Sequence, residues 1–174
     1  MKNIILTGFM GTGKSSVGKM LAKETGYLYC DLDAMIVEQI GMTINEIFAI
    51  HGEAFFRDLE ADAVKQVSSA ARQVVATGGG AVIREENRAL LRKSGVVVNL
   101  EASLEEIYNR LSIDSERPLF NDRKSPGKLA ELLEQREPYY ADADIRIDTT
   151  GRKVEDVVQE ILLLLRGMSG FGNS

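Results

Sequence analysis

One short stretch near the amino terminus constrains this chain of 174 residues more than any other. Residues 8–15 read Gly-Phe-Met-Gly-Thr-Gly-Lys-Ser, which matches the pattern G-x-x-x-x-G-K-[ST] of a phosphate-binding loop, or P-loop. An apolar run precedes the loop and a helical pattern over 15–23 follows it, as the motif requires. Backbone N–H groups would surround a phosphate, Lys14 would reach the β- and γ-phosphates, and the Ser15 hydroxyl would ligate Mg²⁺. The alternative, a glycine-rich turn with no ligand, is disfavoured because four fixed positions match in the right context.

Hydrophobic patterning predicts an α/β domain. The predicted buried strands are residues 3–7, 27–30, 73–77, 96–100 and 144–148. Most of these runs do not alternate polar and apolar residues, as expected when helices cover both faces of a parallel sheet. Helical patterns separate the strands, and capping boxes at Thr43–Glu46 and Ser103–Glu106, with proline after Ser125, predict three helix starts. We therefore predict one domain with right-handed crossovers and a frayed tail over 167–174.

Composition excludes several classes of protein. Apolar residues make up 44% and charged residues 27% of the chain, which is an ordinary globular balance. A lone cysteine, Cys30, excludes an internal disulfide and a zinc site with several thiolates, and we interpret it as a packing residue. The net charge of −5 argues against binding to nucleic acid or to an anionic membrane. With neither a membrane-spanning run nor a signal peptide in the sequence, we expect a cytoplasmic protein.

Two segments fit a plain alternation of strands and helices poorly. Residues 33–60 are helical in pattern throughout, which is too long for one crossover helix. Residues 112–125 are polar, contain Pro118 and show little periodicity. Long excursions of this kind in a compact domain are often functional.

Polar and glycine residues follow two of the predicted strands. Asp31 and Asp33 follow the second strand, at the edge where parallel sheets bind ligands. One carboxylate could hold Mg²⁺ through water and the other could orient an acceptor hydroxyl, although a helix cap explains such a pair equally well.

Three glycines, Gly78–Gly80, follow the third strand, either because something approaches the backbone closely or because the chain turns tightly there. The third strand has no terminal aspartate, so Asp31 is the best candidate for the metal-binding acid.

Three arginines stand beside aromatic residues or in the polar excursion: Arg57, Arg117 and Arg136. Arginine pairs with planar carboxylates and with phosphates through two parallel hydrogen bonds. Taken singly, each arginine is better explained as a solvated ion pair at the surface.

Together these segments resemble the shikimate kinase family, within the nucleoside-monophosphate-kinase-like P-loop group. The resemblance spans nearly the whole chain and rests on residues 8–16, 31–33, 42–60, 76–80, 117–120 and 136–140. It implies a three-layer α/β P-loop fold with a five-stranded parallel sheet. It also implies a helical substrate-binding region over 33–60 and a mobile lid over 112–124. The implied activity is the ATP- and Mg²⁺-dependent phosphorylation of the 3-hydroxyl of shikimate in aromatic amino-acid biosynthesis, by a monomer.

The motif and the resemblance together assign roles to individual residues. The expected catalytic residues are Lys14, Asp33 and Arg117. The expected ATP contacts are Gly11, Thr12, Gly13, Lys14, Ser15, Ser16, Arg110, Arg117 and Arg152. The expected shikimate contacts are Asp33, Arg57, Glu60, Gly78, Gly79, Gly80 and Arg136. Mg²⁺ would be held by Ser15 and, through water, by Asp31.

Other functions remain open at this point. Gluconate kinases and nucleoside-monophosphate kinases share the P-loop and the lid. A nucleotide-dependent switch is disfavoured because a GTPase should carry an N-K-x-D motif, which the sequence lacks. A nucleotide-binding module with a protein partner would bind ATP tightly but would not need arginines away from the nucleotide.

Overall fold

The computed structural model describes residues 2–113, 125–168 and 170–171. The predicted lid over 112–124, with Arg117, therefore lies almost wholly outside the described residues. Five parallel strands form one sheet in the order β2-β3-β1-β4-β5. The strands are β1 (Asn3–Thr7), β2 (Leu28–Asp31), β3 (Gln73–Ala76), β4 (Gly95–Glu101) and β5 (Ile145–Asp148). The prediction of a five-stranded parallel sheet is confirmed.

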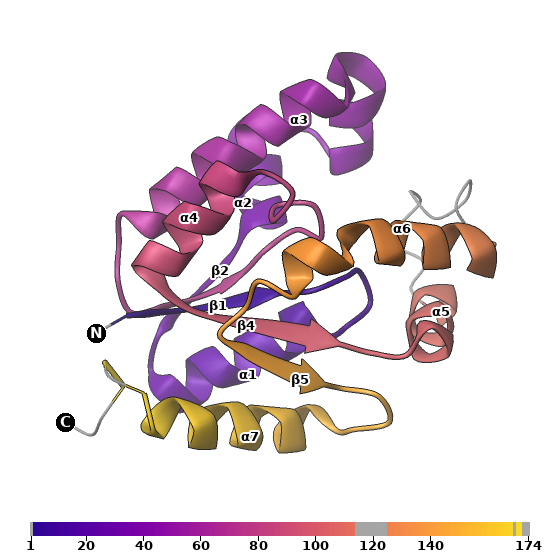
Figure 1. Cartoon of the computed structure of the whole chain (residues 1–174). Coiled ribbons are helices and arrows are strands. Elements are labelled where there is room, and N and C mark those ends of the chain that lie inside the picture. Colours follow the sequence, from indigo (N-terminus) through magenta and orange to yellow (C-terminus); the bar gives the residue numbers. More distant parts are fainter. Residues whose placement is uncertain (1, 114–124, 169, 172–174) are drawn as a thin grey trace.

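Helices cover both faces of the sheet (Figure 1). On one face lie α1 (Lys14–Thr25) and α7 (Val154–Arg166). On the other lie α2 (Leu32–Ile40), α3 (Ile44–Ser68) and α4 (Glu85–Ser94). Two further helices, α5 (Leu104–Ile113) and α6 (Pro126–Tyr140), lie beyond the carboxyl ends of the strands and pack against each other. The result is the three-layer α/β arrangement that the sequence predicts.

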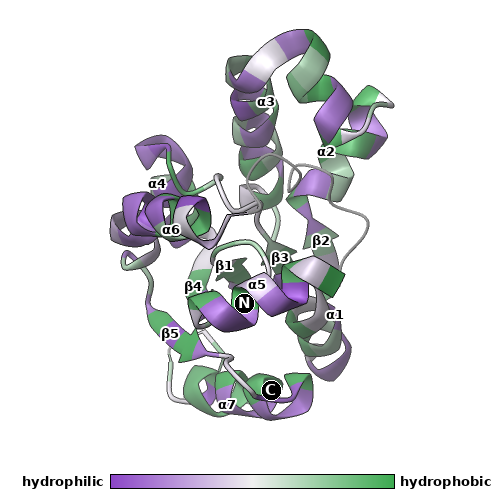
Figure 2. Ribbon diagram, turned by 90° about the vertical axis from the view of Figure 1, so that its right-hand side faces the viewer, coloured by the Kyte–Doolittle hydropathy of each residue, from purple (hydrophilic) through white to green (hydrophobic). Residues whose placement is uncertain are grey.

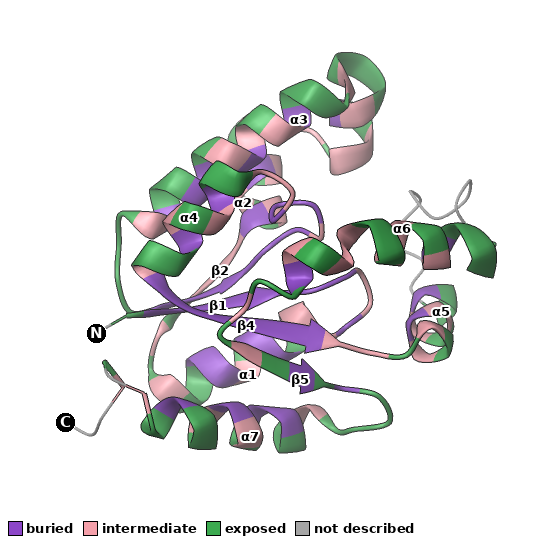
Figure 3. Cartoon of the chain, in the orientation of Figure 1, coloured by how far each residue is buried: buried purple, intermediate pink, exposed green. Residues whose placement is uncertain are grey.

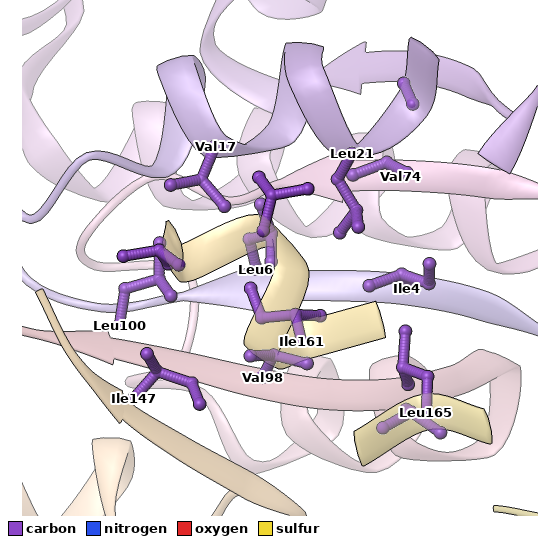
Figure 4. Packing of buried hydrophobic residues seen from close by; sticks show 14 residues of the cluster. Ile4, Leu6, Val17, Leu21, Val74, Val98, Leu100, Ile147, Ile161 and Leu165 are labelled. Carbon is purple, nitrogen blue, oxygen red and sulfur yellow. The ribbon is translucent and has the colours of Figure 1, made fainter. Parts of the chain in front are cut away.

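The central strands β1 and β4 are buried on both faces because a core of apolar side chains lies on each side (Figure 3). On the α1 and α7 side, Leu6 and Val98 of the sheet contact a cluster that includes Leu21 and Ile161 (Figure 4). A second cluster fills the opposite layer, where α2, α3 and α4 pack. Met168 and Phe171, which follow α7, pack against the first cluster.

The outer strands differ from the expectation of burial. Every residue of β2 is at least partly accessible, and Leu28 is 66% exposed. Two residues of β5 are exposed as well. Both strands lie at the edges of the sheet, where only one neighbouring strand covers them. The apolar runs predicted strands correctly but could not indicate which strands lie at an edge.

The helix starts follow the sequence signals with one difference. Thr43 and Glu46 form the complete capping box, and Ser125 caps α6 with Pro126 at its first position. Ser103 forms only half of its predicted box, because its side chain accepts from the Glu106 N–H while its own N–H donates to Thr150. That partner comes from a loop 47 residues downstream, which local spacing cannot reveal.

The long helical excursion consists of α2 and the first part of α3. Within α3, Gly52 adopts a non-helical conformation with φ 82° and ψ 172°, so two helices meet end to end at this glycine. This break explains why the pattern over 33–60 looked too long for one helix. Among the described residues, no helix is both long and apolar enough to span a membrane.

Candidate active site

The loops that follow β1, β2 and β3 meet at one edge of the sheet, because parallel strands place their carboxyl ends together. Figure 2 looks onto this edge, with α3 and α4 on one side of the sheet and α1 and α7 on the other. The P-loop follows β1, Asp31 ends β2, and Gly78–Gly80 follow β3. The segments that the sequence singled out are thus neighbours.

The P-loop is held by its own side chains. Lys14 Nζ donates to the carbonyl oxygens of Gly8, at 2.7 Å, and Phe9, at 2.8 Å. The Thr12 hydroxyl donates to the Phe9 carbonyl at 2.8 Å. Gly8 has φ +138°, and a Cβ there would overlap the Leu100 carbonyl, so only glycine fits. The loop ends at Gly13, which precedes the first turn of α1. A loop that leads directly into a helix N-terminus is the setting in which the predicted phosphate cradle would form.

Asp31 uses its two carboxylate oxygens differently. Oδ1 accepts from the N–H groups of Asp33, at 3.0 Å, and Ala34, at 3.2 Å, and so caps α2. Oδ2 accepts from the Tyr29 hydroxyl at 3.2 Å and lies 3.5 Å from Ser15 Oγ. The helix cap is therefore confirmed, and the second oxygen, close to Ser15, leaves Asp31 a candidate for the metal-binding acid.

The residues present fit a magnesium ion. A serine hydroxyl and a carboxylate are the hard oxygen ligands that Mg²⁺ prefers, and it normally takes one or two of them together with phosphates and water. The described residues contain no cluster of three or more His, Cys, Asp or Glu side chains that would form an all-protein metal site. Ser15 follows the P-loop directly and lies 3.5 Å from Asp31, so an ion held here could also be coordinated by phosphates of a nucleotide bound at the loop.

Each residue of the glycine run faces a different side chain. A Cβ on Gly78 would lie 2.8 Å from Asp33 Oδ1 and 3.0 Å from Glu60 Oε1. A Cβ on Gly79 would lie 3.3 Å from a guanidinium nitrogen of Arg136, and one on Gly80 would overlap the Arg57 guanidinium. None of the three glycines has a positive φ. The chain does turn here, since the Ala81 N–H donates to the Gly78 carbonyl at 3.1 Å, but the absence of a positive φ means that the glycines match the close approach of functional groups rather than a backbone conformation that only glycine adopts.

Arg57 and Glu60 form a buried ion pair on α3. Their side chains are 13% and 1% exposed, and Arg57 donates to Glu60 Oε2 at 2.8 Å. Burial raises the pKa of Glu60, whereas the Arg57 charge opposes that rise. The other oxygen, Oε1, is buried and finds no hydrogen-bond partner among the described residues. It lies against Gly78 next to Asp33, so two carboxylates face the same point. A hydroxyl-bearing ligand at this point would satisfy Oε1.

Arg136 approaches the same site from α6. Its guanidinium lies 5.9 Å from the centre of the Phe9 ring of the P-loop and next to Gly79. The Tyr140 hydroxyl donates to the Gly79 carbonyl at 2.6 Å. Two arginines from different helices thus flank the glycine run, while the P-loop adjoins it.

The three arginines predicted to contact the nucleotide differ in what surrounds them. Arg110 donates to the Gly11 carbonyl at 3.1 Å and to the Thr149 carbonyl at 2.9 Å, so it joins the P-loop to the loop after β5. Arg152 lies in the loop before α7, is exposed, pairs with Glu160 of that helix at 2.6 Å and donates to the Asp148 carbonyl at the end of β5. Arg117 lies outside the described residues. Ser16 is exposed beside the P-loop.

Sequence reasoning missed Thr149. Its hydroxyl lies 3.1 Å from the Thr12 carbonyl and 2.8 Å from the Glu101 carbonyl, and it accepts from Arg110. It thereby joins the P-loop to the end of β4. Its only sequence signal is a threonine directly after a strand.

Two binding regions therefore share this edge of the sheet. One is the P-loop, and the other brings together the buried Glu60, the half-buried Asp33 and two arginines, a set of groups that suits a small anionic molecule with hydroxyl groups. This combination defines a small-molecule kinase of the P-loop class.

Comparison with known proteins gives the family. A family model described as shikimate kinase matches residues 10–166. The shikimate kinase of Geobacter metallireducens is 60% identical over 167 residues, which cover 96% of this chain and 93% of that protein. The shikimate kinase of Geobacter sulfurreducens is 57% identical over 165 residues, which cover 95% and 91%. The chain belongs to the shikimate kinase family.

Solved structures agree with this assignment. Shikimate kinase from Acinetobacter baumannii in complex with shikimate superposes with a TM-score of 0.91 at 37% identity, covering 96% of this chain and 94% of that one. A gluconokinase from Sinorhizobium meliloti has a TM-score of 0.59 at 19% identity, covering 95% and 92%. The second likeness shows the fold alone.

Proposed function

We propose that this chain transfers the γ-phosphoryl group of ATP to the 3-hydroxyl of shikimate, giving shikimate 3-phosphate and ADP. The observation that carries the proposal is the convergence of Asp33, Glu60, Arg57 and Arg136 on the glycine run beside the P-loop. The family membership supports it, and the Acinetobacter baumannii relative is described in complex with shikimate. No observation favours a second acceptor.

The acceptor side suits a carboxylate that also carries hydroxyl groups. Arg57 and Arg136 would bind the carboxylate, since guanidinium groups pair with carboxylates through two parallel hydrogen bonds. Glu60 Oε1 and Asp33 would accept hydrogen bonds from the hydroxyl groups. The chemistry occurs at a hydroxyl, so the carboxylate orients the acceptor toward the phosphate donor.

The donor side lies at the P-loop. The backbone from Gly11 to Gly13, with Ser15 and Ser16, would bind the ATP phosphates, and Lys14 would leave its loop carbonyls to neutralise charge on the γ-phosphoryl group. Ser15 and, through water, Asp31 would hold Mg²⁺, which when bound neutralises charge on the phosphate oxygens. Arg110 and Arg152 would flank the base, and Arg117 of the proposed lid would contact the phosphates.

Asp33 is our candidate for the group that takes the proton from the 3-hydroxyl or holds that hydroxyl in line. Its place beside Gly78, next to the buried Glu60, supports this role. We further propose that the chain is a single kinase domain with its substrate-binding region at 33–60. We also propose that it acts as a cytoplasmic monomer.

The test is ADP release from purified protein given ATP, Mg²⁺ and shikimate, with quinate and gluconate as control acceptors. We expect turnover with shikimate and little with either control. Turnover with gluconate instead of shikimate would replace the acceptor assignment while keeping the kinase class. Tight ATP binding with no turnover on any acceptor would contradict the proposal.

A further inference from the structure

The hydroxyl of Tyr140 is the polar end of an otherwise buried side chain. Tyr140 is the last residue of α6, is 2% exposed, and packs in the cluster that contains Phe9 and Leu129. Its hydroxyl donates to the Gly79 carbonyl at 2.6 Å. A carbonyl oxygen can only accept, so the direction of this hydrogen bond is fixed. One hydrogen bond therefore ties the end of α6 to the centre of the glycine run, although 61 residues separate the two partners in sequence.

The same hydroxyl adjoins Arg136. Residues four apart on a helix share a face, so Arg136 and Tyr140 point in the same direction from α6. A Cβ on Gly79 would lie 3.3 Å from Arg136 and 3.6 Å from the Tyr140 oxygen, so both groups reach the same glycine. Burial raises the pKa of Tyr140 to about 12, and the charge and hydrogen bond of Arg136 oppose that rise. The hydroxyl donates its proton to the Gly79 carbonyl, so its lone pairs face outward for the adjacent Arg136 guanidinium.

We propose that Tyr140 is a positioning residue for acceptor binding, which holds the Arg136 guanidinium against Gly79 through its hydroxyl. The inference rests on the proposed function, because it assumes that Arg136 binds the acceptor carboxylate. It goes beyond that function in assigning a specific task to a buried tyrosine that does not itself contact the substrate.

The position of Arg136 explains why holding it in place would matter for acceptor binding. Phe9 of the P-loop lies on one side of the guanidinium and Gly79 on another. A fixed guanidinium would therefore set the distance between the acceptor's carboxylate and the phosphate cradle. Without the hydroxyl, the Gly79 carbonyl would lose its donor and Arg136 would lose a polar neighbour beside the same glycine. The cost should appear in acceptor binding, because the hydroxyl donates its hydrogen bond to the glycine run on the acceptor side.

The test compares Tyr140→Phe with Tyr139→Phe. Each change removes one hydroxyl and keeps the ring, and the Tyr139 ring lies 5.1 Å from the Arg88 guanidinium rather than against the glycine run. We expect Tyr140→Phe to raise the calorimetric Kd and the KM for shikimate about tenfold, as for the loss of a hydrogen bond to a charged group. The kcat and the KM for ATP should change less than threefold. Tyr139→Phe should resemble the wild type in all four quantities.

A double-variant cycle separates positioning from general stabilisation. If the hydroxyl acts through Arg136, Tyr140→Phe should have little further effect on kcat/KM in an Arg136→Ala background. An equal tenfold loss in both backgrounds would overturn the proposal, as would a lower melting temperature with unchanged Kd and KM.

Should Tyr140→Phe not fold, Gly79→Ala provides a second test, because the added methyl group would push against Arg136 and the Tyr140 hydroxyl. An unchanged shikimate KM in that variant would contradict the proposal. Absence of shikimate turnover in the wild type would instead refute the proposed function.

Discussion

At the scale of single residues, the two carboxylates on the acceptor side differ in their surroundings. Glu60 is buried and shares a hydrogen bond with Arg57, and its raised pKa reflects that burial. Asp33 lies in the first turn of α2, directly after the buried Leu32, and is half-buried beside Gly78. Glu60 already accepts from Arg57, so we assign proton transfer to Asp33 and leave Glu60 the tasks of orienting Arg57 and binding a hydroxyl.

Replacing Asp33 by Asn tests this assignment. The change keeps the shape and removes the charge, so shikimate phosphorylation should fall by roughly 10²–10⁴ if Asp33 takes the proton. Calorimetric binding of ADP should stay within about twofold, since Asp33 is not part of the P-loop. Glu38→Gln, an exposed change on the same helix, serves as the control. If Asp33→Asn retained most of the activity, the proton-transfer role would be excluded, and Asp33 would serve only as an acidic residue in the first turn of α2.

Arg57→Ala tests the carboxylate clamp. Removing one partner of a buried charged pair costs about 2–5 kcal/mol, which corresponds to a loss of roughly 30- to 4,000-fold in kcat/KM. Arg57→Lys should rescue poorly, because lysine lacks the planar fork. Arg84, which pairs with Asp58 and is 36% exposed, provides the surface control Arg84→Ala.

The methyl ester of shikimate makes the same test independent of how much enzyme is folded. Arg57→Ala also leaves Glu60 buried without its partner, so some loss of stability is expected. The ratio of rates with free acid and with ester does not depend on the amount of active protein. Wild type should strongly prefer the acid, and Arg57→Ala should barely distinguish the two. Equal rates with both acceptors in the wild type would exclude the clamp.

At the scale of elements, α3 shows how stability and function are separated along one helix. The capping box of Thr43 and Glu46 lies at its start, whereas Arg57 and Glu60 lie beyond the break at Gly52. A break in the helix interrupts the hydrogen-bonded ladder, so changes at the start should not be transmitted to the ion pair.

Thr43→Ala should therefore lower stability without changing acceptor binding. Loss of this cap costs about 1 kcal/mol in the free energy of unfolding, measurable by urea denaturation. Thr43→Ser keeps the hydroxyl and should cost much less. The shikimate KM of both variants should stay within about twofold of the wild type, because the break lies between the cap and Arg57. A large rise in KM for Thr43→Ala would show that α3 acts as one rigid unit.

Local signals predicted the elements well and predicted their tertiary partners poorly. The five strands lie within one residue of the predicted runs, since apolar runs ending in polar or glycine residues mark a strand locally. The P-loop and the glycine run were likewise found from local pattern. By contrast, the Thr150 partner of Ser103, the Thr149 contacts with the P-loop and the Tyr140 tie to Gly79 join distant segments. Only the folded chain reveals such contacts.

At the scale of the whole molecule, two tyrosine hydroxyls link stability to alkaline pH. Burial, joined by the Asp31 charge at Tyr29, raises the pKa of Tyr29 and of Tyr140 to about 12, from an ordinary value of 10.0. The folded protein therefore keeps these protons at a pH where the unfolded chain releases them. This contribution to stability is complete below pH 10 and is lost as the pH rises toward 12.

Urea unfolding at several pH values between about 9 and 11.5 measures this loss. For Tyr140 alone the slope approaches about 1.4 kcal/mol per pH unit between the two pKa values. The wild type should thus lose stability more steeply than Tyr140→Phe, which lacks that proton. Parallel curves for the two proteins would mean that the Tyr140 hydroxyl titrates alike in the folded and unfolded states.

Both ends of the described chain lie away from the phosphate-binding edge. Lys2 enters β1 at the opposite edge of the sheet, and Gly170 after α7 comes back beside it (Figure 1). A linker joined to either end would therefore emerge on the side remote from Lys14 and Asp33. The molecule could be attached to a solid support through such a linker with its reactive edge turned toward the liquid, and small molecules would still reach it.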